Sequence, residues 1–356
     1  MIKRQIKICY IAGRESSYSR TRNVLAGLKK AGFEVITCFP SDKSFRHYPG
    51  LIWKFFKAKR GCDLIVVGFY GQLLFPFVRL LTWKPILYDV YISTFDTMVY
   101  DRGVAKSTSL KAKLYWLFDW FSMKCSHAII LETQDHIEDY AKKFKISIER
   151  FRHLFLTVDE SVIHPVESNR SEPEFLVHFH GEYAPFHGVR IILEAAHLLR
   201  DKHVQFQIIG KGITWKADRD FAEKAQLNNV RFIDWVPYEQ LAKTMAKADC
   251  SLGFFGKNPR TARVLTNKVV ETLAVGKPLI TVENQPVQEL VIHEESVLLV
   301  PAGDAVALAN AIIKLKSDPK LKNKLAENGH RAYLEKCSMD VFSSRLNTIV
   351  NELVEQ

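Results

Sequence analysis

The sequence predicts an α/β protein of two doubly wound, Rossmann-like domains that face each other across a cleft. Short apolar runs that end at glycine or polar residues alternate with amphipathic helical runs, which is typical of parallel sheets covered by helices. The alternation stops at a polar segment with two prolines, residues 151–175, and then restarts. The chain has 356 residues, enough for two domains that each bury a core.

The first half opens with a βαβ unit. Residues 6–13 and 33–39 are predicted strands, and Thr21–Ala31 is a predicted helix that ends at Gly32. The other elements predicted here are strands at 63–69, 85–93 and 127–133, an amphipathic segment at Tyr48–Arg60, and helices at 113–125 and Asp135–Lys143. The loop after the first strand lacks the GxGxxG pattern, so the dehydrogenase-type dinucleotide fingerprint is absent.

The second half repeats the alternation after residues 151–175, which we interpret as the inter-domain linker. The strands predicted here are 175–181, 204–210, 230–236, 250–255, 278–282 and 297–302. The helices predicted here are 188–201, 239–248, Val269–Val275, Ala305–Lys316, Pro319–Lys336 and Met339–Val354. Two successive arrays of this kind predict two separate parallel sheets.

The stretch Gly256–Pro278 is the strongest candidate for a binding site. It begins where a predicted strand ends and places three basic residues in a short loop: Lys257, Arg260 and Arg263. It then passes through Asn267 and Lys268 into a helix, and the free N–H groups and dipole of a helix N-terminus favour an anion. Glu271, one turn into the helix, is a suitable acceptor for sugar hydroxyls. The stretch therefore predicts a seat for a phosphorylated ligand.

The charge is uneven along the chain. Residues 1–160 hold 26 Lys and Arg against 15 Asp and Glu, whereas residues 161–356 are balanced at 24 of each. No nucleic-acid motif accompanies this positive half, so an anionic membrane surface is the favoured partner. Tyr48–Arg60 combines apolar and basic residues, which suits either a surface helix that packs one face on the sheet or a segment that binds the membrane surface. The scattered cysteines and the absence of a signal or spanning segment predict a cytoplasmic protein, peripheral on the inner face of a membrane.

Two polar clusters leave alternatives open. Asp89, Asp96 and Asp101 follow one predicted strand, where they indicate either an acceptor site or structural caps and loop hydrogen bonds. His178 and His180 lie on one face of a strand, where packed or hydrogen-bonded histidines compete with metal ligation. We predict neither a metal nor a cofactor, since the scattered cysteines form no zinc-binding pattern.

Over nearly its whole length the sequence resembles the family-4 retaining glycosyltransferases of the GT-B fold. Five pieces carry the likeness, in order and with similar spacing: residues 156–165, 180–199, 206–212, 230–255 and 267–281. The resemblance implies an acceptor-binding domain at 1–160, a nucleotide-sugar domain at 161–337, and a final helix at 338–356 that crosses back to the first domain. It implies transfer of a sugar from a UDP- or GDP-linked donor to a glycan or lipid-linked acceptor, in cell-envelope polysaccharide or glycolipid synthesis.

The resemblance also implies roles for individual residues. Glu271 should accept the hydroxyls of the donor ribose, and the backbone of Val264–Lys268 should face the diphosphate. Apart from the resemblance, a site without a metal needs fixed cations for the charge of the leaving group, and we assign this role to Arg263 and Lys268. Asp89 or Asp96 should orient the acceptor hydroxyl. The remaining donor-binding residues that we predict are Gly13, His187, Lys211, Gly212, Trp235, Val236, Arg260, Thr266 and Asn267.

Three departures from the family pattern keep other functions open. Arg263 stands at the first glutamate position of the Glu-x7-Glu motif, and Glu182 and His187 replace a common Arg and Lys. The chain resembles a branch of the family with His-Gly and Arg-x3-Asn-Lys, which favours a variant enzyme. His187, just before Gly188 at a helix start, suits either a cap or a phosphate contact. The alternatives are a GT-B enzyme of another reaction, such as a sugar-nucleotide epimerase or a phosphorylase, and a catalytically silent binding protein.

Overall fold

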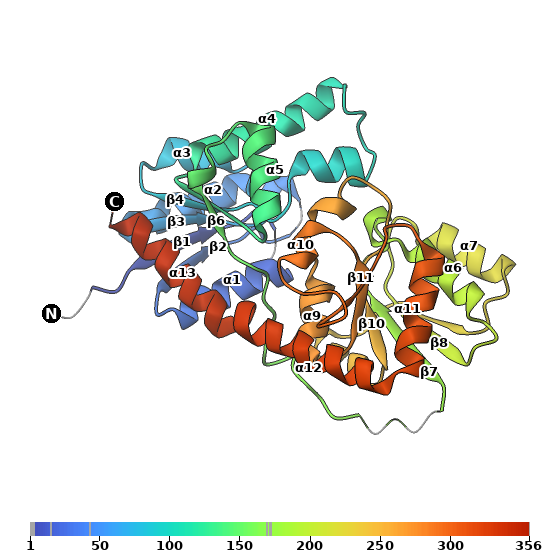
Figure 1. Cartoon of the computed structure of the whole chain (residues 1–356). Helices are drawn as coiled ribbons and strands as arrows, with labels where there is room; N and C mark the ends of the chain where they lie inside the picture. Colours follow the sequence, from blue (N-terminus) through green and yellow to red (C-terminus); the bar gives the residue numbers. More distant parts are fainter. Residues whose placement is uncertain (1–3, 15, 43, 169, 171–172, 356) are drawn as a thin grey trace. The chain divides into compact units, whose positions relative to one another are not determined.

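The structure is a computed structural model of the chain, and it describes residues 4–14, 16–42, 44–168, 170 and 173–355. The chain divides into two compact units (Figure 1). The first unit comprises Met1–Leu156 together with Met339–Gln356, and the second comprises Thr157–Ser338. The domain boundary that the sequence predicts, at residue 160, lies close to this division.

The first unit is a six-stranded parallel sheet with helices on both faces. Its strands lie in the order β2 (Glu34–Cys38), β1 (Lys7–Ile11), β3 (Leu64–Val67), β4 (Ile86–Asp89), β5 (Ala128–Leu131) and β6 (Phe151–His153). Its main helices are α1 (Ser19–Lys30), α2 (Tyr48–Ala58), α3 (Phe75–Leu81), α4 (Leu110–Cys125), α5 (Gln134–Phe144) and α13 (Met339–Val354). The central strands are mostly apolar because both faces of the sheet are covered.

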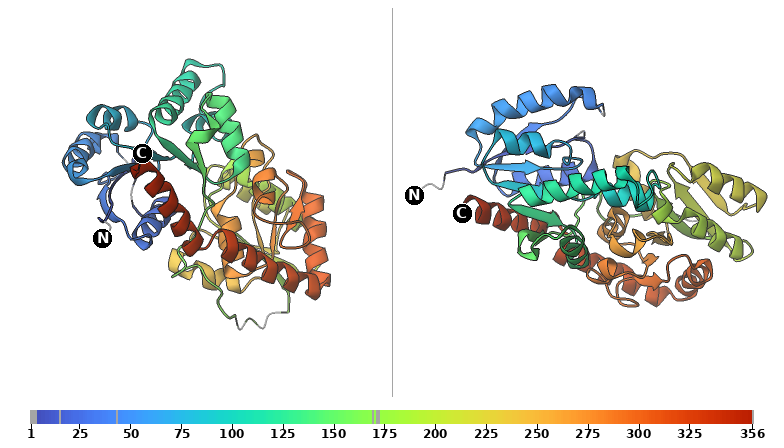
Figure 2. Two further views of the ribbon diagram at one scale, coloured as in Figure 1. Left: turned by 60° about the vertical axis from the view of Figure 1, so that its left-hand side comes forward. Right: turned by 90° about the horizontal axis from the view of Figure 1, so that it is seen from above.

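Alternate residues of β1 divide between two hydrophobic cores. Ile8 and Tyr10 pack against α1 and α13, whereas Cys9 and Ile11 pack in the core beneath α2, α3, α4 and α5. The last helix belongs to the first unit, and Figures 1 and 2 show α13, in dark red, beside α1. Ser343 of α13 donates a hydrogen bond to the Gly27 carbonyl of α1, 3.1 Å away.

The second unit is also a six-stranded parallel sheet. Its strands lie in the order β12 (Leu298–Val300), β11 (Leu279–Val282), β10 (Cys250–Leu252), β7 (Phe175–His180), β8 (Val204–Ile209) and β9 (Val230–Ile233). Its helices are α6 (Val189–Leu198), α7 (Trp215–Lys224), α8 (Leu241–Ala246), α9 (Asn267–Val275), α10 (Gln285–Gln288), α11 (Ala305–Ser317) and α12 (Pro319–Lys336). Val177 and Phe179 of β7 pack in a core with α6 and α11, so His178 and His180 point to the opposite face, toward α9.

The order of the strands fixes where ligands are expected. In the first sheet the chain goes from β1 to β2 on one side and then to β3 on the other side. In the second sheet it goes from β7 to β8 and β9 on one side and then returns to β10 on the other. Open α/β sheets bind ligands outside the carboxyl ends of the strands at such switch points. The switch points lie between β1 and β3 and between β7 and β10.

The structure confirms the predicted fold class of two Rossmann-like α/β units and corrects three details. The predicted linker begins too early, because Phe151–His153 is an edge strand and Leu156 is buried in the first unit. Part of the predicted linker, residues 169 and 171–172, lies outside the described residues. Helix α3 was not predicted because Pro76 interrupts an apolar run, although proline is tolerated in the first turn of a helix. Helix α7 was not predicted because its sequence is mostly polar.

Candidate functional site

The carboxyl ends of β7 and β10, at the switch point of the second sheet, form the candidate site. The loop after β7 and the loop after β10 are hydrogen-bonded to each other, with Phe255 N donating to the His187 carbonyl and Gly256 N to the Phe186 carbonyl, both at 3.0 Å. Gly188 has a φ of 66°, and a Cβ on it would lie 2.4 Å from Gly256 N. Only glycine therefore allows the two loops to approach this closely.

Helix α9 begins at this point and offers its N-terminus. Thr266 is the N-cap residue, but its side chain makes no capping hydrogen bond, and its buried Oγ1 has no hydrogen-bond partner among the described residues. The first turn of the helix contains no acidic residue and does contain Lys268. No described side chain caps this helix, and the positive end of its dipole therefore favours an anion.

Lys268 brings a second positive group to the same place. Its side chain is 5% exposed, and no described residue accepts a hydrogen bond from its Nζ. Burial lowers the pKa of this amine to about 7, although the carboxylates of Glu271 and Glu182 favour the charged form. Gly181 has a φ of 141°, and a Cβ on it would lie 3.1 Å from Lys268 Cε. A desolvated amine beside a helix N-terminus, with no hydrogen-bond acceptor among the described residues, suits a phosphate group.

Glu271 lies one turn further along α9 and is held by a histidine. Its Oε2 lies 2.9 Å from Nε2 of His180, the last residue of β7. Nδ1 of His180 lies 2.9 Å from Nε2 of His178, and Nδ1 of His178 lies 3.1 Å from the Gln207 side-chain nitrogen on β8. Of the two sequence-based alternatives for the histidines, the structure shows hydrogen bonding. No group of three His, Cys, Asp or Glu that could hold a metal ion occurs among the described residues.

Hydrogen bonds from Asn284 hold the basic loop before α9 in place. The Asn284 amide donates to the carbonyls of Thr261 and Val264, at 2.7 and 3.1 Å. No sequence pattern predicts this role, because Asn284 also caps α10 and asparagine is common at helix caps. The guanidinium of Arg260 lies 4.4 Å from the Phe186 ring centre, and Arg263 Nε donates to the Pro259 carbonyl. The Arg260 side chain therefore packs against the loop after β7, and the Arg263 side chain is hydrogen-bonded within its own loop.

His187 is buried, and its protonation limits the role that we predict for it. Its Nδ1 contacts the carbonyl oxygen of Glu182, which only accepts, so Nδ1 carries the proton. Burial and the positive charge of Lys268 hold the pKa of His187 well below its usual value. Neutral His187 therefore has a bare Nε2, which accepts hydrogen bonds and cannot donate one to a phosphate.

The residues predicted to border the nucleotide base follow β8 and β9. The Trp235 side chain is 73% exposed, and Val236 is half-buried beside it. Lys211 pairs with Asp234 at 2.7 Å, and a Cβ on Gly212 would lie 2.5 Å from Tyr183 N. The structure thus places these residues on neighbouring strand ends of the same edge of the sheet.

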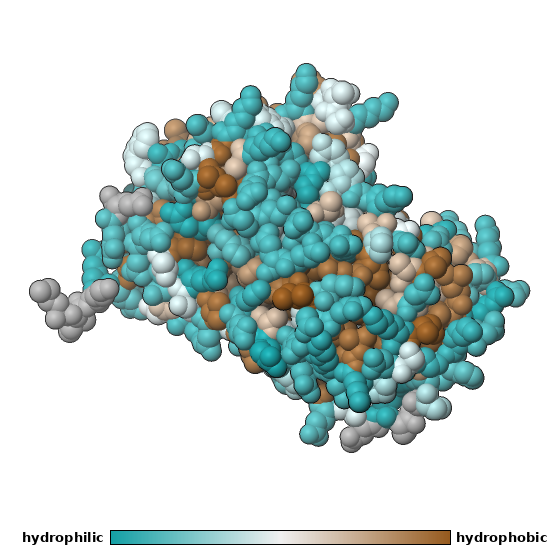
Figure 3. Space-filling view, viewed as in Figure 1, coloured by the Kyte–Doolittle hydropathy of each residue, from teal (hydrophilic) through white to brown (hydrophobic). Residues whose placement is uncertain are grey.

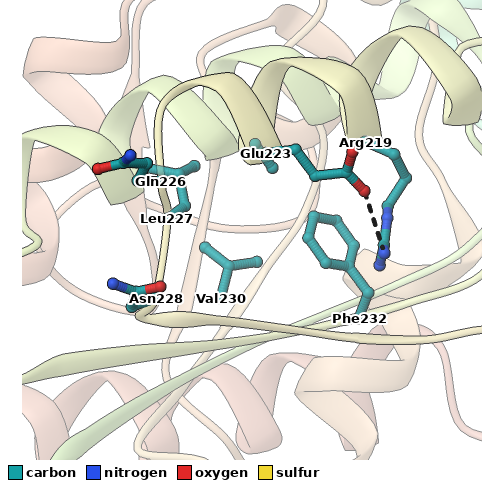
Figure 4. Close-up of a pocket in the computed structure, with 8 residues that line it drawn as sticks. Arg219, Glu223, Gln226, Leu227, Asn228, Val230 and Phe232 are labelled. Atoms are coloured by element: carbon teal, nitrogen blue, oxygen red, sulfur yellow. Dashed lines mark ion pairs between the residues drawn. The ribbon is translucent and has the colours of Figure 1, made fainter.

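The surface cavities of the second unit include two that differ in size. The larger, about 570 Å³, lies between α7 and β9, and Figure 4 shows Arg219 and Glu223 paired at 3.7 Å over Phe232 in it. None of the predicted site residues lines it. The smaller, about 260 Å³, lies under the basic loop, with Lys257, Thr261 and Glu283 in its wall.

In the first unit the predicted carboxylates have protein partners. Both oxygens of Asp89 accept hydrogen bonds from the Arg20 guanidinium at 2.8 to 3.1 Å, and both residues are buried. Asp96 pairs with Lys143. Of the two alternatives for this cluster, the ion pairs support the structural one, most clearly for Asp89.

Two further groups beside this cluster were not predicted. Asp119 accepts from the Ser93 hydroxyl at 2.7 Å and from the amides of Thr94 and Phe95, and burial raises its pKa to about 6. Glu132 lies 2.9 Å from His136. Burial opposes the charged form of His136, but the Glu132 carboxylate raises the pKa of His136 above its ordinary value. Asp119 was overlooked because it lies inside an aromatic helix, where a lone carboxylate gives no pattern.

Aromatic side chains gather at the switch point of the first sheet. Tyr18 stacks on Phe69 with ring centres 3.9 Å apart, and Tyr91 lies edge-on to both. Tyr70 and Tyr91 have φ values of 56° and 46°, a backbone conformation that costs of order 1–3 kcal/mol and is frequent at functional sites. A Cβ on Gly13 would lie 2.2 Å from the Tyr70 carbonyl oxygen, so a residue with a side chain does not fit at position 13.

Helices α2 and α3 expose aromatic and basic side chains together. Trp53 has the Lys57 amine 3.5 Å from its ring centre, and Trp83, which is 84% exposed, has Arg79 at 5.0 Å. Figure 3 shows brown, hydrophobic residues at the surface of the first unit in this region. One residue of the predicted membrane-binding segment Tyr48–Arg60 cannot contact a membrane, since Phe55 is 1% exposed and belongs to the core. No helix in the described part of the chain is long and apolar enough to span a membrane.

Comparison with known proteins places the chain among proteins of the GT-B fold. Residues 174–318, most of the second unit, match the family described as glycosyl transferases group 1. An uncharacterized glycosyltransferase of Methanocaldococcus jannaschii is 28% identical over 167 residues, which are 46% of this chain and 45% of that protein. The matched part thus spans about half the length of that relative.

Solved structures are similar over nearly the whole chain. HepE of Anabaena, in complex with UDP, superposes with a TM-score of 0.77 at 14% identity, covering 98% of this chain and 100% of HepE. Sucrose-phosphate synthase of Thermosynechococcus elongatus gives 0.78 at 18% identity, covering 98% and 99%. These similarities establish the GT-B fold that the sequence predicts.

Proposed function

We propose that the protein is a glycosyltransferase that moves a sugar from a nucleotide-sugar donor to a hydroxyl of a glycan or lipid-linked acceptor. The observation that carries this proposal is the group at the start of α9. There an uncapped helix N-terminus, the buried amine of Lys268 and the carboxylate of Glu271 meet at the switch point of the second sheet. Cationic groups suit a diphosphate, and a carboxylate one helical turn away suits a ribose diol. The match to glycosyl transferases group 1 supports this assignment.

The donor is expected to carry UDP. HepE of Anabaena, a protein of the same fold, is described in complexes with UDP and with UDP-glucose. Trp235, exposed after β9, provides a flat face for a base in the second unit of this chain. GDP-linked donors are the alternative, and a panel of both nucleotides separates the two.

The chemistry required of the protein is charge stabilisation. The bond between the sugar C1 and the diphosphate oxygen breaks, a bond from C1 to the acceptor oxygen forms, and the acceptor proton passes to the departing phosphate. In this proposal the configuration at C1 is retained and no protein nucleophile is needed. Lys268, Arg263 and the N-terminus of α9 would meet the negative charge that develops on the diphosphate, so transfer should persist in a metal chelator.

Incubation of the purified protein with UDP- and GDP-linked sugars tests the proposal. Slow hydrolysis of one donor is expected, and Glu271→Ala should abolish it. Glu223→Ala, on the exposed face of α7, is the matched control and should keep it. Hydrolysis that survives Glu271→Ala would contradict the site. Binding without turnover would favour the silent binding protein, and an altered sugar on the intact nucleotide would favour an epimerase.

We also propose that the first unit attaches to an anionic membrane through α2 and α3. The exposed Trp53, Leu80 and Trp83 would enter the headgroup region, and the neighbouring cations would meet acidic lipids. The enzyme would then act at the cytoplasmic face of a membrane, where lipid-linked acceptors lie.

Vesicle sedimentation tests the attachment. The protein should sediment with vesicles of phosphatidylcholine and phosphatidylglycerol but not with phosphatidylcholine alone, and Trp53→Ser with Trp83→Ser should release it. Trp235→Ser, an exposed tryptophan of the second unit, is the control. Sedimentation that is unchanged in the double variant would rule out this surface.

A further inference from the structure

A chain of four polar side chains crosses the second sheet and ends at Glu271. Gln207 and His178 lie opposite each other on β8 and β7, His180 is two residues further along β7, and Glu271 is on α9. The three successive contacts measure 3.1, 2.9 and 2.9 Å. His178 and Gln207 are buried, and the side chains of His180 and Glu271 are 12% and 9% exposed. These four residues are called the relay below.

The fold does not require polar residues at these positions. The central strand of the first sheet, β1, crosses its sheet with apolar side chains and a buried tyrosine and makes no comparable chain. Buried polar groups lower stability unless every one is satisfied, and apolar residues of similar size are often as stable or more so. The relay is therefore better explained by what it does for Glu271 than by the stability of the sheet.

Only one arrangement of protons satisfies the relay without an additional charge. An amide nitrogen only donates, so the Gln207 side chain donates to Nδ1 of His178. Neutral His178 then carries its proton on Nε2 and donates to Nδ1 of His180. His180 in turn carries its proton on Nε2 and donates to the Glu271 carboxylate.

The reverse arrangement ends in a conflict. If the Gln207 oxygen faced His178, every donor would reverse, and the bare Nε2 of His180 would oppose the Glu271 carboxylate. An additional proton would be needed to remove that repulsion. The first arrangement needs no such proton, because each donor already faces an acceptor. The relay therefore runs in one direction, from Gln207 to Glu271.

We infer that His180, oriented by His178 and Gln207, is a positioning residue that fixes Glu271 to receive the two ribose hydroxyls of the donor nucleotide. This inference rests on the proposed function. One carboxylate oxygen, Oε2, is held by His180, and no described residue occupies Oε1, which is left to accept from the ligand. By orienting Glu271, the relay thus sets the preference of the site for ribonucleotides.

The binding test compares UDP with 2′,3′-dideoxy-UDP by calorimetry. Hydrogen bonds to a charged group are worth about 1.5–3 kcal/mol, so the protein should prefer UDP by roughly tenfold or more. In His180→Leu the affinity for UDP should fall to that for the dideoxy compound, whose own affinity should stay unchanged. His180→Gln should restore part of the preference, because an amide N–H reaches the same carboxylate. His203→Asn, on the surface of the second unit, is the control and should change neither.

Two results would overturn the inference. A preference for UDP that is unchanged in a folded His180→Leu variant would show that Glu271 needs no positioning. Equal losses of affinity for both compounds would show that His180 only supports the fold.

A second measurement does not depend on the ligand. Nitrogen-15 NMR of the unliganded protein should show His178 and His180 as neutral rings protonated at Nε2, and Gln207→Glu should shift the proton of His178 to Nδ1. Rings protonated at Nδ1 in the unaltered protein would overturn the direction of the relay. If neither UDP nor GDP bound, the proposed function and the ligand assigned here would fall together, while NMR would still decide whether the relay is polarised as described.

Discussion

The two sheets share one architecture but differ in what lies at their switch points. Between β7 and β10 the second unit places an uncapped helix N-terminus and a buried amine that has no hydrogen-bond acceptor among the described residues. Beside the switch point between β1 and β3 the first unit places buried charges that are paired, such as Arg20 with Asp89, and a cluster of aromatic rings.

This difference indicates different ligands for the two units. A buried charge that the protein leaves without a partner lowers stability until a ligand of opposite charge arrives, whereas a paired charge is already neutralised. In the proposed function the second unit would therefore hold the charged diphosphate. The first would hold a hydroxylated acceptor, against which aromatic rings can pack.

The largest expected effect is on the paired charges of the first unit. Arg20→Leu leaves the Asp89 carboxylate buried without its partner, so the free energy of unfolding should fall by about 3–5 kcal/mol. Denaturant unfolding measures this change. Lys7→Met is the control, since it breaks an exposed pair with Glu34 and should change stability by less than about 1 kcal/mol. Equal effects of the two variants would remove the distinction between the buried and exposed pairs.

The opposite pattern is expected for the unpaired charge of the second unit. Lys268→Met should lower the rate of transfer or donor hydrolysis about a hundredfold, which corresponds to about 3 kcal/mol in the barrier. The same variant should be as stable as the original protein or more stable, because a desolvated amine is removed. A stability loss comparable to that of Arg20→Leu would show that Lys268 is structural.

A smaller effect should reveal the strained backbone of the first unit. Tyr70 has a positive φ, where glycine avoids the steric cost of a Cβ. Tyr70→Gly and Tyr70→Ala remove the same ring, so their difference isolates the backbone. The glycine variant should be more stable by about 1 kcal/mol in thermal or chemical unfolding. If alanine were the more stable of the two, the strain at this position would be contradicted.

The smallest effect is a pH dependence of nucleotide binding. The Lys268 amine has a pKa of about 7 in the folded protein, below the ordinary lysine value that applies when it is unfolded. The unfolded chain therefore binds more protons above pH 7, and this group makes stability rise as pH increases from about 7 toward the unfolded pKa. A diphosphate should raise the pKa again, so binding at pH 8 should take up a fraction of a proton and weaken as pH rises further.

Calorimetry of UDP binding in buffers of different ionisation enthalpy measures that uptake. Lys268→Met should abolish it, and Lys257→Met, on the exposed part of the basic loop, should not. Proton uptake that survives Lys268→Met would assign it to another group.

Most elements of the fold follow from local patterns in the sequence. Apolar runs such as Leu64–Val67 read as strands because their burial on both faces demands apolar residues, and Asn267–Val275 reads as a helix that Gly276 ends. The elements that were not predicted are those whose local pattern is weak. Helix α3 contains a proline, α7 is mostly polar, and β6 lies in a segment whose following residues read as a linker.

The sequence by itself determined the α/β class, the two arrays of strands and the region around Glu271, because these depend on residues close together in the chain. Only the tertiary structure decided which distant groups meet. It brings Gln207 and the two histidines into line with Glu271, and it pairs Asp89 with Arg20. The physical reason is that strand order and helix packing set such contacts, and neither is written in the spacing of residues along one element.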